Sequence, residues 1–131
     1  MSTYYPIAIV TLLSGLLCSG MGIAVTRART RSRIFPPVMT GDAALERTVR
    51  AHANTLEWMP IFLPALWLFA MYWSTPWAAA FGSVWILGRI IYFIGYASAA
   101  ERRFAGFFIQ AMAALVLLLG SLGRIVYLML V

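Results

Sequence analysis

Long apolar runs separated by short polar segments dominate this chain. Four runs, at 4–25, 58–73, 77–97 and 104–131, consist mainly of aliphatic and aromatic residues. A helix needs about 20 such residues, at about 1.5 Å of rise each, to cross about 30 Å of hydrocarbon. The second run reaches that length only when its polar N-terminal part is included. The pattern therefore predicts four membrane-spanning helices, at about 4–25, 42–73, 77–97 and 104–131.

Composition strengthens this interpretation. Of the 131 residues, 63% are hydrophobic and 11% are charged, whereas charged residues make up about 25% of a soluble domain. The four helices leave no segment for a separate soluble domain. The run at 4–25 is not preceded by a basic stretch and is too long for the apolar part of a signal peptide, so we expect it to be retained. The predicted fold class is all-α integral membrane, with 1–131 forming one four-helix bundle.

Charge indicates how the helices are oriented. All ten basic residues are arginines, and eight of them lie at 27–33, 47–50 and 102–103, on one side of the predicted membrane. The positive-inside rule then predicts that both termini face away from the cytoplasm. The net charge of +6 favours anionic lipids, and we interpret Arg27, Arg31, Arg33 and Arg102 as headgroup contacts. Because the arginines flank spans, we expect membrane lipids and no nucleic acid as partners.

The sequence offers little for metal or thiol chemistry of its own. Cys18 is the only cysteine and His52 the only histidine, so we expect no metal site. Cys18 lies in the middle of the first apolar run and is interpreted as a packed thiol. Thiol chemistry would therefore require a thiol from a ligand. The absence of lysine and of a retention signal favours a bacterial inner membrane.

Polar side chains within the second and third runs are the main functional signal. Arg50, Asn54 and Glu57 share one helix face at spacings i, i+4 and i+7. An ionisable group inside a membrane costs about 2.5–3.5 kcal/mol on insertion scales, so such groups are kept where they pair or bind something polar.

The third run repeats this arrangement. Arg89, Tyr92 and Tyr96 are spaced i, i+3 and i+7, and Arg103 follows one heptad later. If the two helices pack together, their polar faces line one pocket near the cytoplasmic interface, with Trp58 beside it.

The chemistry of this pocket indicates a class of ligand. Guanidinium groups bind carboxylates bidentately, Glu57 could hold an ammonium, and Asn54 can donate and accept. We expect a small zwitterion with more than one carboxylate, and an arginine beside a bound thiol would lower the pKa of that thiol. Structural alternatives remain: an Arg89–Glu57 ion pair between helices, Tyr92 and Tyr96 as interfacial aromatic residues, and His52 as a packing residue rather than a base.

Two blocks of residues resemble a known family, the membrane-associated proteins in eicosanoid and glutathione metabolism (MAPEG). The first is Glu-Arg-x-x-Arg-Ala-x-x-Asn-x-x-Glu-x-x-Pro, at 46–60. The second is Arg-x-x-Tyr-Phe-x-Gly-Tyr-x-x-Ala-Ala-x-x-Arg, at 89–103, and it looks like the branch of leukotriene-C synthases and microsomal glutathione transferases. The resemblance covers most of the chain from residue 36 to residue 107.

This resemblance implies a homotrimer of four-helix subunits that holds glutathione, as co-substrate, at subunit interfaces near the cytoplasmic face. The positions that match the glutathione-binding residues of the family are Arg50, Asn54, Glu57, Tyr92, Tyr96 and Arg103. Arg103 would also stabilise the thiolate, and Arg29 and His52 fall where a neighbouring subunit contributes.

The chain departs from the branch at three positions. Trp58 replaces the usual Tyr beside the glutathione site, and His52 replaces a Gln. Thr30 replaces the second Arg of an adjacent pair, a difference that concerns leukotriene-type catalysis and leaves the glutathione positions unchanged.

We therefore expect a membrane glutathione transferase, also acting as a glutathione-dependent peroxidase, that attacks lipophilic electrophiles or lipid hydroperoxides. The main alternative is a non-catalytic scaffold that binds lipid or glutathione. A small multidrug exporter is a further alternative, but such exporters resemble this chain only in size, and their essential Glu lies in helix 1, where this chain has no acidic residue.

Overall fold

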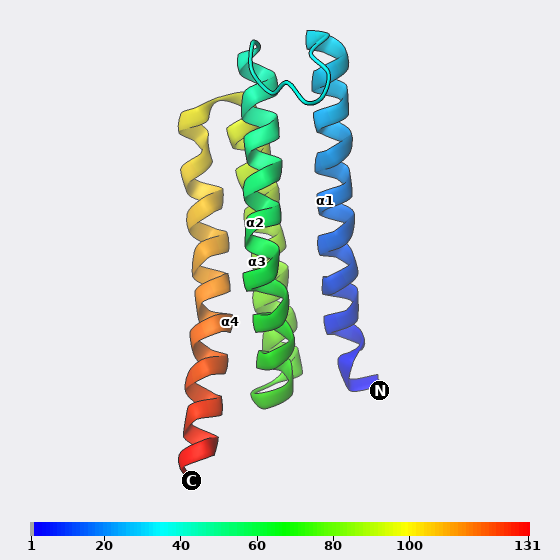
Figure 1. The fold of residues 1–131 in the computed structure, drawn as a ribbon. Coiled ribbons are helices and arrows are strands. Elements are labelled where there is room, and N and C mark those ends of the chain that lie inside the picture. Colours follow the sequence, from blue (N-terminus) through cyan, green and yellow to red (C-terminus); the bar gives the residue numbers. More distant parts are fainter. Residues whose placement is uncertain (1) are drawn as a thin grey trace.

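The computed structural model describes residues 2–131 and consists of four long helices that run alternately up and down (Figure 1). The elements in order are η1 (Ser2–Tyr4), α1 (Tyr5–Ser32), α2 (Ala43–Tyr72), α3 (Thr75–Ser98), η2 (Ala100–Arg103) and α4 (Phe104–Leu130). Each of the four long helices is long and apolar enough to cross a membrane. The predicted all-helical membrane fold is confirmed.

The connections place the charged segments together. The α1–α2 loop and η2 lie at one end of the bundle, and both chain termini lie at the other (Figure 1). The end with the α1–α2 loop and η2, called here the arginine-rich end, carries the arginines at 27–33, 47–50 and 102–103.

The first helix is longer than predicted. It continues past residue 25 to Ser32, a segment in which Arg27, Ala28, Arg29 and Arg31 are good helix formers. The helix ends at Arg33, which adopts a left-handed conformation with φ of 56°. The Pro36-Pro37 pair follows and cannot extend a helix.

The start of α2 was predicted correctly. The Asp42 carboxylate accepts a hydrogen bond from the Leu45 amide at 2.9 Å. Glu46 accepts one from the Gly41 amide at 3.1 Å. Asp42 thus satisfies one of the amides that a helix N-terminus leaves without an intrahelical partner, and Glu46 ties the residue before this cap to the first turns of the helix.

The apolar core fills the half of the bundle nearest the termini. Its centre is the stacked pair of Phe62 on α2 and Trp85 on α3, with ring centroids 3.8 Å apart and an interplanar angle of 4°. The surrounding buried residues come from all four long helices and include Ile7, Val10, Ala65, Leu66, Ala78, Ala114 and Leu117. Towards the arginine-rich end, the buried residues include the polar Thr55 and Arg89 as well as apolar ones.

Helices α3 and α4 approach closely at two glycines. A Cβ added at Gly106 would overlap the backbone N and Cα of Tyr92. One added at Gly88 would lie 2.7 Å from the backbone nitrogen of Gln110. Small residues are what permit such close backbone contact in membrane bundles. This contact fixes where Tyr92 stands relative to α4.

We predict that Gly106→Ala separates α3 from α4 and lowers the thermal unfolding midpoint in detergent, with a cost of about 1–3 kcal/mol for the overpacked contact. Gly123→Ala on the same helix is the matched control, because a Cβ there meets nothing within 4 Å. The control should be neutral or slightly stabilising, since alanine favours a helix over glycine. Equal midpoints for the two variants would contradict the proposed contact.

Candidate functional site

A polar cavity of about 390 Å³ opens near the arginine-rich end, between α2, α3 and α4. Its lining residues are Arg50, Asn54, Tyr92, Tyr96, Arg103, Phe104 and Phe107. Five of these, Arg50, Asn54, Tyr92, Tyr96 and Arg103, were predicted from the sequence, and the structure brings them together from α2, α3 and η2. The two phenylalanines of α4 add an apolar wall.

On the α2 side, Arg50 lines the cavity and forms an ion pair with Glu57 beside it. Arg50 Nη1 donates to Glu57 Oε1 at 3.1 Å, and Asn54 Nδ2 donates to Glu57 Oε2 at 3.4 Å. The side chains of Arg50 and Glu57 are 58% and 55% exposed, so both charges can reach a ligand. Glu57 therefore pairs with Arg50, and the alternative of an Arg89–Glu57 ion pair is wrong.

Arg89 stands behind this wall rather than in the cavity. Its side chain is fully buried. Nε and Nη2 donate to Thr55 Oγ1 at 3.2 and 2.6 Å, and Nη2 also donates to Asn54 Oδ1 at 3.1 Å. Its Cζ lies 4.2 Å from the centroid of the Tyr92 ring. The expectation of three guanidiniums lining the pocket is thus corrected to two, because α3 turns Arg89 towards α2 inside the bundle.

Arg89 holds two of the lining residues in place. Its hydrogen bond fixes which end of the Asn54 amide points inward, leaving the Nδ2 group to face Glu57. Its position over Tyr92 is a cation–π contact, which is strengthened by the loss of water. The buried Arg89 thereby orients the Asn54 amide and the Tyr92 ring, both of which line the cavity.

The opposite wall places one cation among aromatic rings. Tyr92 and Tyr96 stack with centroids 5.6 Å apart. The Arg103 Cζ lies 5.7 Å from the centroid of the Tyr96 ring and 4.7 Å from that of Phe104. Arg103 Nη1 donates to the Ala100 carbonyl at 3.1 Å, within the turn of η2. No carboxylate of the described chain pairs with Arg103, so its charge is available to an anion.

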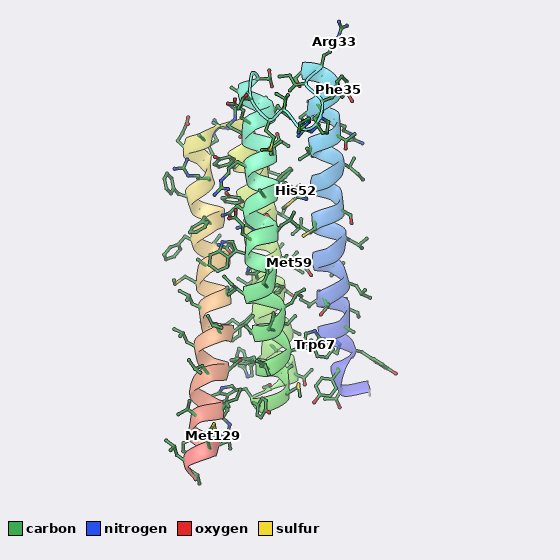
Figure 2. All side chains as sticks on the ribbon, in the orientation of Figure 1. Arg33, Phe35, His52, Met59, Trp67 and Met129 are labelled. Atoms are coloured by element: carbon green, nitrogen blue, oxygen red, sulfur yellow. The ribbon has the colours of Figure 1, made fainter. Side chains whose placement is uncertain are left out.

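Four predicted residues do not line the cavity. Glu57 lies beside it, in contact with Arg50 and Asn54, and the other three lie further away. Trp58 packs edge-on against Phe107, with centroids 5.9 Å apart, and supports the aromatic wall from α2. His52 points from α2 towards α1 (Figure 2), where a Cβ added at Gly22 would lie 3.8 Å from its Cε1 atom. Arg29 donates to the Ile34 and Val38 carbonyls at 3.2 and 2.6 Å and secures the α1–α2 loop. Contacts of Arg29 and His52 with a neighbouring subunit remain predictions.

Sequence reasoning missed two buried polar residues. Thr55 accepts from Arg89 and donates to the Ala51 carbonyl at 3.0 Å. Its position directly after Asn54 was the available signal, but threonine is common in membrane helices. Gln110 is fully buried on α4 against Gly88, and its side-chain amide has no hydrogen-bond partner among residues 2–131. A glutamine inside an otherwise apolar run marks this position.

The site can bind a polar anion against an aromatic wall. Two guanidiniums from opposite walls provide forked donors for carboxylates, and Glu57 provides a single acceptor for an ammonium. Tyrosines contribute hydroxyls on apolar rings. Within residues 2–131 there is no group of three metal-ligating side chains.

Comparison with protein families matches residues 7–123 to the MAPEG family. The chain belongs to the MAPEG family. It is 42% identical to an uncharacterized protein of Synechocystis over 92% of this chain and 88% of the relative. It is 39% identical to human microsomal glutathione S-transferase 2, over 89% and 80% respectively. It is also 39% identical to guinea pig (Cavia porcellus) leukotriene C4 synthase, over 92% and 81%. With its four apolar helices, this MAPEG protein is a multi-pass membrane protein.

We predict that Thr55→Val destabilises the bundle by about 1–3 kcal/mol, because the buried Arg89 loses the oxygen that accepts two of its hydrogen bonds. Thr55→Ser keeps the hydroxyl and is the control. Thermal unfolding midpoints in detergent should rank wild type, then Ser, then Val. A Val variant at least as stable as the Ser variant would show that Thr55 acts only through packing.

Proposed function

We propose that this MAPEG protein is a membrane glutathione transferase that also reduces hydroperoxides at the same site. Two relatives whose sequences match most of the chain are named glutathione S-transferase and leukotriene C4 synthase. The observation that carries the proposal is the cavity itself, which is lined by Arg50, Arg103 and two tyrosines. Glutathione has two carboxylates, one ammonium and one thiol, which these side chains complement.

Each wall has a separate role in this proposal. On α2, Arg50 and Asn54 bind carboxylate oxygens, and Glu57 binds the ammonium of the γ-glutamyl group. Tyr92 and Tyr96 hold the peptide backbone by their hydroxyls. Arg103 faces the thiol and stabilises it as thiolate, because a neighbouring guanidinium lowers the pKa of a thiol. The aromatic wall of Phe104 and Phe107 lies where an apolar second substrate would approach.

Catalysis follows from the thiolate. In the transferase reaction, the sulfur attacks an electrophilic carbon and the leaving group departs with its electron pair. In the peroxidase reaction, the sulfur attacks the terminal oxygen of a hydroperoxide, releasing an alcohol. A second glutathione then reduces the resulting sulfenic acid, forming glutathione disulfide and water. Arg103 stabilises negative charge on sulfur, and the site brings a water-soluble and a lipid-soluble reactant together.

The membrane setting belongs to the same proposal. The exposed apolar surface of the helices gives lipophilic electrophiles or lipid hydroperoxides a route from the bilayer. We infer a homotrimer in which Arg29 and His52 of one subunit approach the cavity of the next. The arginine-rich end would face the cytoplasm and the termini would face away from it. A cyanobacterial relative supports a bacterial inner membrane as the location.

The decisive experiment titrates the detergent-purified protein with glutathione and follows the ultraviolet absorbance of the thiolate. We expect a thiolate signal in the wild type and none in Arg103→Ala. Turnover with a model electrophile should fall on the order of 10²–10³-fold, as for loss of one charge-stabilising donor. The neighbouring Arg102→Ala is the control, because Arg102 is exposed and does not line the cavity.

Each outcome has a distinct meaning. Glutathione binding without a thiolate in the wild type would point to a glutathione-binding scaffold in place of an enzyme. No glutathione binding at all would mean that the cavity residues form a structural ion network. Normal turnover in Arg103→Ala would remove its assigned role.

We predict that Glu57→Gln lowers the affinity for glutathione about tenfold, or about 1.4 kcal/mol, through loss of the ammonium contact. The matched test uses deaminated glutathione, which lacks that ammonium. Isothermal titration should show little effect of Glu57→Gln on binding of this analogue. An equal loss for both ligands would mean that Glu57 acts only by holding Arg50.

A further inference from the structure

A second cationic recess lies on another face of α3, away from the glutathione cavity. It has a volume of about 290 Å³ and is lined by residues of α1, of α3 and of the beginning of α2. Arg27 and Arg31 stand one helical turn apart on its α1 wall. Both side chains are exposed, and neither has a hydrogen-bond or ion-pair partner within residues 2–131.

These two arginines differ from their neighbours. Arg29 donates to the carbonyls of the α1–α2 loop, and Arg47 donates to the Ala97 carbonyl at 3.4 Å. Asp42 also lines the recess, but its carboxylate caps α2 by accepting from the Leu45 amide. The recess thus presents two uncommitted guanidiniums against one committed carboxylate.

An apolar groove of about 600 Å³ continues from this recess between the same two helices. Leu13, Leu16 and Gly20 of α1 form one side, and Ile86, Ile90 and Ile94 of α3 form the other. Phe93 lines both the recess and the groove. The two therefore form one α1–α3 groove, which is cationic at the arginine-rich end and apolar towards the middle of the bundle.

We propose that the α1–α3 groove binds one anionic phospholipid, with its phosphate at Arg27 and Arg31 and an acyl chain along the apolar part. Charge complementarity and shape both favour this occupant, because a phosphate attached to a long apolar chain needs a cationic and an apolar compartment side by side. Basic pockets between membrane helices at the cytoplasmic side are suited to such headgroups. The excess of one positive charge in the recess selects a lipid of net negative charge over a zwitterionic one.

The test measures lipid retention on delipidated, detergent-purified protein by native mass spectrometry. Phosphatidylglycerol and phosphatidylcholine of the same chain length are the probes. We expect phosphatidylglycerol to be retained preferentially. The double variant Arg27→Gln/Arg31→Gln should lose this preference, with affinity falling roughly 25-fold if each arginine contributes about 5-fold.

A charge-matched control separates the site from general attraction. Arg33→Gln/Arg102→Gln removes the same net charge from exposed arginines that do not line the groove, and it should retain the lipid. An equal loss in both double variants would overturn the site in favour of diffuse attraction. Displacement of the lipid by millimolar inorganic phosphate would also overturn it, since the acyl chain would then contribute nothing.

A third variant tests the apolar compartment. Gly20→Leu places a side chain in the groove where a Cβ meets nothing within 4 Å, and it should lower retention of the lipid without changing the oligomeric state in size-exclusion chromatography. A change of oligomeric state with unchanged lipid retention would mean that a second copy of the chain covers the groove. None of the three variants changes a residue that lines the glutathione cavity, so failure of this site leaves the proposed transferase function unaffected.

Discussion

The buried guanidinium of Arg89 is the constraint on which the polar half of this bundle depends. A charge at that depth cannot face lipid, so α3 must turn it towards α2, where it meets Thr55 and Asn54. No carboxylate within residues 2–131 pairs with it. Because a buried charge is costly unless its hydrogen bonds are well made, the packing of α2 against α3 is restricted to a register that supplies them. That register also sets the cavity wall.

The cavity wall therefore follows from how α2 supplies hydrogen-bond acceptors to Nε and Nη2 of Arg89, whose Nη1 has no partner within residues 2–131. The Asn54 amide is oriented by Arg89 from behind and by Glu57 from the front. Tyr92 is held between the guanidinium and the backbone of α4, which approaches at Gly106. Preorganised groups of this kind do not have to be rearranged when a ligand binds. Their electrostatic stabilisation is stronger because no reorganisation energy is lost. Arg103 is different, because it sits on the short η2 turn, where its guanidinium contacts two aromatic rings and the Ala100 carbonyl of the same turn.

The sequence alone predicted the four helices and most of the residues that line the candidate cavity. Apolar run lengths gave the four helices, and helical spacing placed Arg50, Asn54 and Glu57 on one face. Residue spacing does not determine how α3 is rotated about its own axis relative to α2. For this reason Arg89 was expected in the pocket, whereas it lies behind the pocket wall. The continuation of α1 to Ser32 was missed because hydropathy marks where a membrane span ends, not where a helix ends.

Helix α3 serves two environments at once. Tyr92 and Tyr96 face the candidate active site, while Phe93 and Ala97 line the α1–α3 groove. Residues adjacent in a helix project about 100° apart, so neither surface can rotate without displacing the other. A lipid bound between α1 and α3 would therefore oppose rotation of α3, which would move the two tyrosines relative to Arg103. The arginines outside the membrane core would then contribute to the geometry of a site that they do not touch.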